Sequence, residues 1–173
     1  MKSALSTIAF LFVFHMAACQ EPPTKRSRVA LGIGHMHVSN GLNDSGQREW
    51  TILPMWVLDY DYSMNNRWTI GIHNDLVTET FKVEGHDGSP EIERSRPFSS
   101  LLGIGFKPGS HAVYSMGFGW EYSHTGNFFM TRLGFEYAIE IPGEWELTPG
   151  LTYDRKWNAY DSFSIALGVG RKF

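Results

Sequence analysis

Cysteine is almost absent from this sequence, because its 173 residues contain only Cys19. A disulfide within the chain is therefore excluded, and so is a zinc site built from several cysteines. An excess of positive charge is lacking too, since the formal net charge is -3. A chain that binds nucleic acid through a basic surface would carry the opposite balance, so we expect no nucleic-acid partner.

Long apolar runs are confined to the N-terminus. Lys2 precedes an apolar run from Ala4 to Phe14. A membrane-spanning helix needs about 20 apolar residues, whereas the core of a secretory signal peptide is shorter and follows a positive charge. We therefore expect residues 1–18 to be a signal peptide, cleaved near 18–20, with residues 19–27 as an N-terminal tether and 28–173 as one folded domain.

The end of this leader allows two interpretations. Met16-Ala17-Ala18-Cys19 resembles a bacterial lipobox, in which the cysteine becomes the lipidated first residue of the mature chain. Met16 departs from that pattern, because Leu, Val or Ile is usual there. Ordinary cleavage near Cys19 or Gln20 is the alternative. In both cases the protein leaves the cytoplasm.

The rest of the chain is rich in aromatic residues, at 14%, and has 18 glycines. From Arg28 onward apolar and small or polar residues alternate with a period of two, and no helical stripe interrupts them. Turn formers such as Pro108-Gly109-Ser110 separate the alternating segments. The pattern predicts about eight strands, spanning residues 28–38, 49–62, 67–83, 96–107, 111–123, 128–141, 145–156 and 161–173.

The two faces of these strands differ in kind. In 111–123, large apolar side chains such as Phe118 and Trp120 share one face, and Gly117 and Gly119 lie on the other. Glycine weakens a strand exposed to water but suits the crowded inside of a narrow barrel. The apolar face would then meet lipid, with aromatic residues at both interfaces.

This orientation predicts an all-β fold, a closed antiparallel up-and-down transmembrane β-barrel of about eight strands. Closure is required because every backbone amide within hydrocarbon must be paired. An even number of strands brings both ends of the chain to the same side of the membrane. The rival interpretation is a secreted soluble barrel that binds an apolar ligand, with the two faces reversed.

The ending from Phe163 to Phe173 alternates and closes on a terminal Phe. It resembles the C-terminal signal of Gram-negative outer-membrane proteins, and the layout of the mature chain is similar to the small OmpA/OmpX-type barrels. The resemblance implies a bacterial outer-membrane location, contact with outer-membrane lipids and folding by the outer-membrane assembly machinery. We expect a monomer.

Charged residues on the small face are the main candidates for a site. We expect a polar network in the lumen, made of His111, Glu121, Arg132, Glu136, Glu140, Glu146 and Asp154. Pairing across the 142–144 turn places Arg132 opposite Asp154 and Glu140 opposite Glu146. Pairing across 124–127 places Arg132 opposite Gly119. The network is either a structural plug, or it forms a selectivity ring or a proton- or cation-binding site around Glu136, Glu140 and Glu146.

Other chemistry is less supported by the sequence. His35 and His37 share a strand face and His73 lies on another strand, but nothing brings them together, so we expect no metal and no cofactor. Ser123 and His124 supply residue types of a lipid-A-modifying enzyme, yet adjacent residues in a strand point to opposite faces. We expect no enzyme activity. The predicted function is membrane integrity, adhesion or passage of narrow solutes.

Overall fold

The computed structural model describes residues 25–84 and 91–173, which form strands and turns. No helix among these residues is long and apolar enough to span a membrane. The strands are β1 (Ser27–Leu42), β2 (Arg48–Ser63), β3 (Trp68–Val77), β4 (Thr80–Val83), β5 (Ile92–Ser95), β6 (Phe98–Phe106), β7 (Ala112–Ser123), β8 (Gly126–Tyr137), β9 (Ile139–Ile141), β10 (Trp145–Lys156) and β11 (Tyr160–Lys172).

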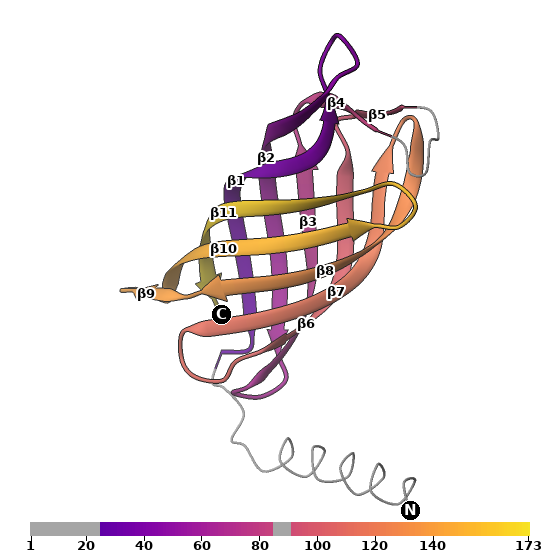
Figure 1. Cartoon of the computed structure of the whole chain (residues 1–173). Coiled ribbons are helices and arrows are strands. Elements are labelled where there is room, and N and C mark those ends of the chain that lie inside the picture. The colour runs from indigo at the N-terminus through magenta and orange to yellow at the C-terminus, as the bar shows by residue number, and fades with distance from the viewer. Residues whose placement is uncertain (1–24, 85–90) are drawn as a thin grey trace, which may run out of the picture.

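The sheet is a closed barrel (Figure 1). Its strands follow the order β1, β2, β3, β6, β7, β8, β10 and β11, and β11 pairs back with β1. Every neighbouring pair is antiparallel, and β9 extends β8 along β10. The predicted closed antiparallel barrel of eight strands is confirmed.

The two ends of the barrel differ. At one end, Ser27 and Phe173 exchange backbone hydrogen bonds of 3.1 and 2.9 Å, and the short turns after β2, β6 and β9 lie beside them. We call this the terminus end. The opposite end carries the turns after β1, β7 and β10 and a hairpin made of β4 and β5, and we call it the hairpin end (Figure 1).

Large apolar side chains cover the outside of the barrel, as the alternation predicts. Phe118 is 57% exposed and Leu133 is 58% exposed, whereas the charged Glu121 and Asp154 are buried. Glycines line the inside where strands come close. A Cβ on Gly119 would lie 2.1 Å from the backbone oxygen of Ser100, so no other residue fits there without a shift.

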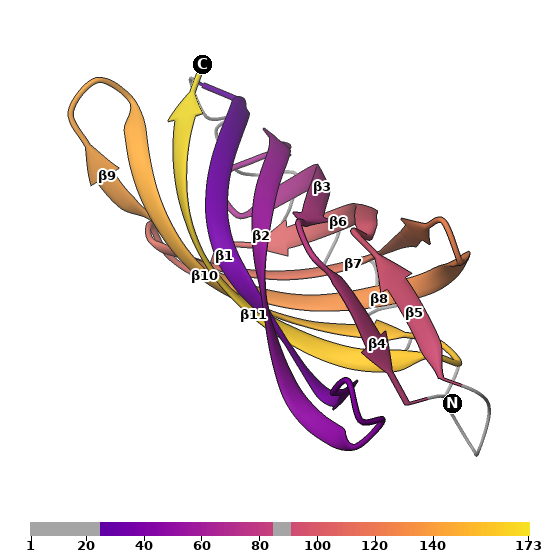
Figure 2. The same ribbon diagram turned by 90° about the horizontal axis from the view of Figure 1, so that it is seen from above.

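The region after β3 departs from expectation. The predicted strand 67–83 ends at Val77, and a separate strand β4 begins at Thr80. β4 pairs with the end of β1, where Gly41 faces Val83, and with β5 (Figure 2). β5 contacts the β7–β8 turn, because Thr125 Oγ1 donates to the carbonyl oxygen of Glu93 and Arg94 donates to that of Gly126. Residues 85–90 lie outside the described part.

The hairpin closes over an apolar core inside the barrel. Phe81 of β4 and Tyr160 of β11 are 6% and 4% exposed, and their rings meet edge to face at 5.8 Å. Because side chains from the hairpin and the barrel interdigitate here, the interior of the hairpin end is filled. The core comprises Met36, Val38, Leu53, Met55, Val77, Phe81, Val83, Ala159 and Tyr160.

Candidate functional site in the barrel interior

Charged side chains fill the rest of the interior, and Arg28 holds the group nearest the terminus end. Its Nη1 donates to Asp61 Oδ2 at 2.7 Å, and its Nη2 lies 3.3 Å from Glu136 Oε2 and 3.2 Å from Thr148 Oγ1. Its Nε donates to Glu146. Arg28 faces Asp61 directly across β1 and β2, so the register itself supplies one partner.

Arg132 forms a second group at mid-barrel. It faces Asp154 across β8 and β10 and donates to it through Nε at 2.6 Å and Nη2 at 2.8 Å. Its Nη2 also donates to Asp75, which comes from β3 on the far side of the lumen. All three side chains are buried. A bidentate, doubly paired guanidinium is a rigid cross-brace, because two carboxylates fix its plane.

Arg94 of β5 forms a third group under the hairpin. It is 0% exposed, and its Nε and Nη2 lie 2.9 and 2.6 Å from Glu121 Oε1. Its Nη1 donates to the carbonyl of Gly126 at 2.8 Å, and the guanidinium lies 4.6 Å from the Phe128 ring centroid. Tyr160 donates to the other oxygen of Glu121 at 2.6 Å. The hairpin is thus fastened to the barrel by a buried ion pair.

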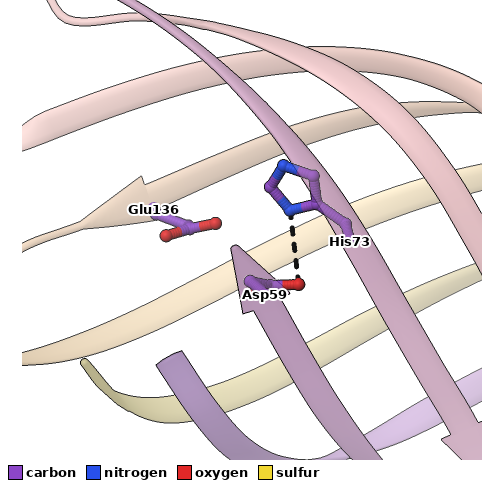
Figure 3. A group of neighbouring side chains, drawn as sticks. All are labelled: Asp59, His73 and Glu136. Carbon is purple, nitrogen blue, oxygen red and sulfur yellow. Dashed lines mark ion pairs between the residues drawn. The ribbon is translucent and has the colours of Figure 1, made fainter. Parts of the chain in front are cut away.

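His73 lies between the first two groups and meets carboxylates from two sides. Its Nδ1 lies 3.4 Å from Asp59 Oδ1, and its Nε2 lies 3.4 Å from Asp61 Oδ1. Figure 3 shows Glu136 facing the same ring from across the lumen. One ligand atom each of Asp59, His73 and Glu136 lies within 4.8 Å of the other two.

A cavity of about 410 Å³ opens at the terminus end and reaches this cluster. Exposed residues such as Lys25 and Glu144 surround its mouth, and Arg28, His73 and Glu136 line its depth. The cavity is large enough to hold several waters. A smaller space of about 60 Å³ lies deeper in the barrel, near Arg132.

The rim of this cavity carries further charges. Lys172 Nζ lies 3.1 Å from Glu140 Oε1 and 3.0 Å from Glu146 Oε2. Glu140 does face Glu146 in the register, as predicted, but Lys172 bridges the two carboxylates. Burial lowers the pKa of Lys107, which follows β6 in the turn.

The residues predicted for the lumen network fall into two sets. Glu121, Arg132, Glu136, Glu146 and Asp154 line the interior and make the contacts described above. The other two lie at the terminus end. Glu140 is exposed on β9, and His111 is exposed in the β6–β7 turn, where its Nδ1 lies 3.0 Å from the carbonyl oxygen of Ala138.

The predicted register between β7 and β8 is wrong by two residues. Ser123 pairs with Gly126 across a loop of only His124 and Thr125, and Arg132 therefore faces Gly117 rather than Gly119. Gly126 has a φ of 139°, a conformation that favours glycine and permits the tight loop. The side chains still face the expected way, because a shift of two preserves alternation.

Several interior residues were not among those predicted for the lumen network. They are Arg28, Asp59, Asp61, Asp75, Arg94 and Lys156. The alternation Asp59-Tyr60-Asp61-Tyr62 was a usable signal, since it separates carboxylates from rings just as the later strands separate glycines from rings. For Arg94 no such signal exists, because the segment around it reads as a polar loop.

The other candidate chemistry is not assembled. His35 is exposed on the outer face and His37 stacks on Phe163 with ring centroids 4.7 Å apart, while His73 points inward. Ser123 Oγ accepts from the Ser95 amide at 3.1 Å and donates to its carbonyl at 3.2 Å. This serine therefore holds β5 in place.

No protein-family model matches the sequence, and no curated protein matches it. Solved structures do match the fold. Neisserial surface protein A is 12% identical, with 85% of this chain and 97% of that one covered and a TM-score of 0.57. The N-terminal β-barrel domain of Pseudomonas aeruginosa OprF is 11% identical, with 86% and 98% covered and a TM-score of 0.52.

The attachment invasion locus protein Ail of Yersinia pestis is 15% identical, with 86% of this chain and 99% of that one covered and a TM-score of 0.49. The first two likenesses agree with the closed barrel described above. This chain has the fold of the small eight-stranded bacterial outer-membrane β-barrels.

Proposed function

We propose that this protein is a non-conducting outer-membrane barrel that serves membrane integrity and presents its hairpin end to the outside. The filled interior of the hairpin end carries this proposal. Val38, Phe81 and Val83 are buried in the apolar core, and the Arg94–Glu121 pair lies beside it. A solute entering from the terminus end would meet packed side chains, and packing of this kind leaves no path for water or ions.

The exterior supports the membrane half of the proposal. Arg171 lies over the ring of Trp145 at 5.4 Å near the terminus end, and Arg155 lies over Trp157 at 5.1 Å near the hairpin end. Arg–Trp pairs at two levels suit the two membrane interfaces, where amphipathic side chains are favoured. The apolar surface between them suits the hydrocarbon region.

The route to the membrane belongs to the same proposal. Residues 1–18 would serve as the leader, and Cys19 would be the point of lipid attachment if the lipobox is used; both lie outside the described residues. With both chain ends of the barrel on one side, the terminus end would face the periplasm. We further propose folding by the assembly machinery, a monomeric state and no enzyme activity.

Conductance across planar lipid bilayers tests the proposal directly. We expect the wild-type barrel to show no steady ion current. A variant in which residues 80–95 are replaced by a flexible Gly-Ser linker should conduct, because the replacement removes Phe81, Val83 and Arg94 from the lumen. Steady conductance by the wild type would contradict the proposal and favour solute passage. A heat-modifiable gel shift checks that both proteins are folded.

A further inference from the structure

A cluster of potential metal ligands lies inside the barrel, next to the ion pairs of Arg28. Asp59 on β2 faces His73 on β3 in the register, and Glu136 reaches them from β8 across the lumen (Figure 3). β8 is not a neighbour of β2 or β3, so only the narrowness of the barrel brings the third side chain in. Among the described residues, these three are the group with metal-ligand spacing.

The donor atoms lie near coordination distance. Each is within 4.8 Å of the others, and His73 Nδ1 and Asp59 Oδ1 are 3.4 Å apart. Tetrahedral zinc with bonds of about 2.0 to 2.1 Å needs ligand atoms about 3.3 Å from one another. The Asp59–His73 spacing already meets this, and Glu136 has to approach by at most about 1.5 Å, within the reach of a rotamer change.

Asp59 supplies a second observation that points to a cation ligand. The residue is 8% exposed, and its Oδ1 is buried without a hydrogen-bond partner. His73 Nδ1 lies 3.4 Å from this oxygen in an ion-pair contact. A buried carboxylate oxygen without a partner is costly, and a cation is the ligand that such an atom binds best.

The local charge balance also favours a cation. Four carboxylates meet here, namely Asp59, Asp61, Glu136 and Glu146. Two permanent cations contact them, Arg28 and Lys172. Lys172 is shared with Glu140, and Arg28 is shared among three of the four carboxylates. The carboxylates therefore outnumber the permanent cations, and a divalent ion would reduce the excess of negative charge.

We propose that Asp59, His73 and Glu136 bind a divalent transition metal, with zinc as the reference ion. One imidazole nitrogen and two carboxylate oxygens form a donor set that zinc accepts, and a water would complete four-coordination. The ion has a way in, because His73 and Glu136 line the cavity that opens at the terminus end. The site is separate from the proposed structural role of the barrel, so either can fail without the other.

Isothermal titration of the purified, folded protein with zinc chloride tests the proposal. We expect one ion per chain. His73→Gln and Asp59→Asn should each weaken binding by more than about 100-fold, beyond what loss of an outer-shell partner costs. His111→Gln, at the exposed rim, is the matched control and should bind as the wild type does. Glu136→Gln is a second ligand variant in case one of the others does not fold.

Cobalt(II) supplies a readout that a structural role would not change. Bound in the same site, it should show the visible absorption of a tetrahedral ion, and zinc should remove that absorption by competition. The absorption should be absent from the His73→Gln protein and present in His111→Gln. Absence of stoichiometric zinc binding by the wild type, or equal binding by wild type and His73→Gln, would overturn the proposal.

Discussion

The two halves of the barrel interior are filled by different physical means. In the hairpin half, apolar side chains pack against one another, and Arg94 and Glu121 are paired with almost no exposure. In the terminus half, Arg28 is surrounded by carboxylates beside a cavity of about 410 Å³. An eight-stranded barrel has too little interior for a channel, but this one shows that the filling need not be uniform.

From this contrast we expect that similar ion pairs contribute differently to the free energy of unfolding in the two halves. A charge that loses its partner inside a dry core stays unsolvated, whereas one beside a wet cavity regains water. Substitutions that remove a cation from each half therefore measure the difference, and the predictions below are ordered by expected size.

The largest effect is expected for Arg94→Met in the hairpin half. It removes the cation closest to the buried Glu121 and leaves only Lys156, whose Nζ is 3.9 Å from Glu121 Oε2, so we expect the free energy of unfolding to fall by about 3 to 5 kcal/mol. Urea titration of the protein in micelles, followed by tryptophan fluorescence, measures this. The double variant R94M/E121Q should recover part of the loss, since it also removes the carboxylate that lost its closest cation, and Lys156 keeps Asp154 as a partner. Lys82→Met, which removes the exposed partner of Glu91, should cause no measurable change.

Phe81→Ala is expected to rank second. Phe81 is 6% exposed and packs on Tyr160, so truncation leaves a cavity in the apolar core and should cost about 3 kcal/mol. Proteolysis of the folded protein should also become faster near the hairpin. Phe81→Leu fills most of the space and should cost less, about 1 kcal/mol. Equal effects of the two substitutions would argue against a packed hairpin end.

Arg28→Met should cost less than Arg94→Met, although Arg28 contacts more carboxylates. Water in the adjacent cavity can solvate Asp61, Glu136 and Glu146 after the cation is lost, so we expect about 1 to 3 kcal/mol. The same urea titration applies. A loss as large as that of Arg94→Met would show that the terminus half is as dry as the hairpin half, and the contrast between them would fail.

The smallest effects are expected on the outer surface, where the two halves should agree. Arg171→Gln and Arg155→Gln each remove a guanidinium from a tryptophan ring, and each should cost about 0.5 to 1 kcal/mol. Parallel titrations in lipid vesicles measure them. Equal losses of unfolding free energy would show that the two halves differ only in their interiors. A clear difference between the two losses would mean that the membrane interfaces also contribute.

Much of the fold could be predicted because alternation is a local property. In 111–123, Phe118 and Gly117 are neighbours in sequence and must face opposite sides, so composition alone assigns each face. The outward position of the aromatic rings follows. The pairing of Arg132 with Asp154 was also predictable, since a short turn joins the strands and fixes their register.

The site was less predictable because it forms across the lumen. Glu136 meets His73, and Arg132 meets Asp75, only because of how the strands are staggered around the barrel. The stagger of the strands depends on the register of every hairpin in the barrel. An error at a single turn, here His124 and Thr125, therefore shifts the predicted partners across the lumen. Arg94 could not be found because its burial depends on a hairpin that folds back over the mouth.

The seam between β1 and β11 has a consequence for the order of events during assembly. Arg28 lies opposite Lys172, so the first strand of the barrel stays without its second neighbour until residues 160–172 arrive. Until then the nascent sheet has two open edges with free amides and carbonyls, which are templates for aggregation. Any partly assembled form therefore needs protection by another protein or by lipid. Because β1 and β11 are far apart in the sequence, we also expect the barrel to fold slowly.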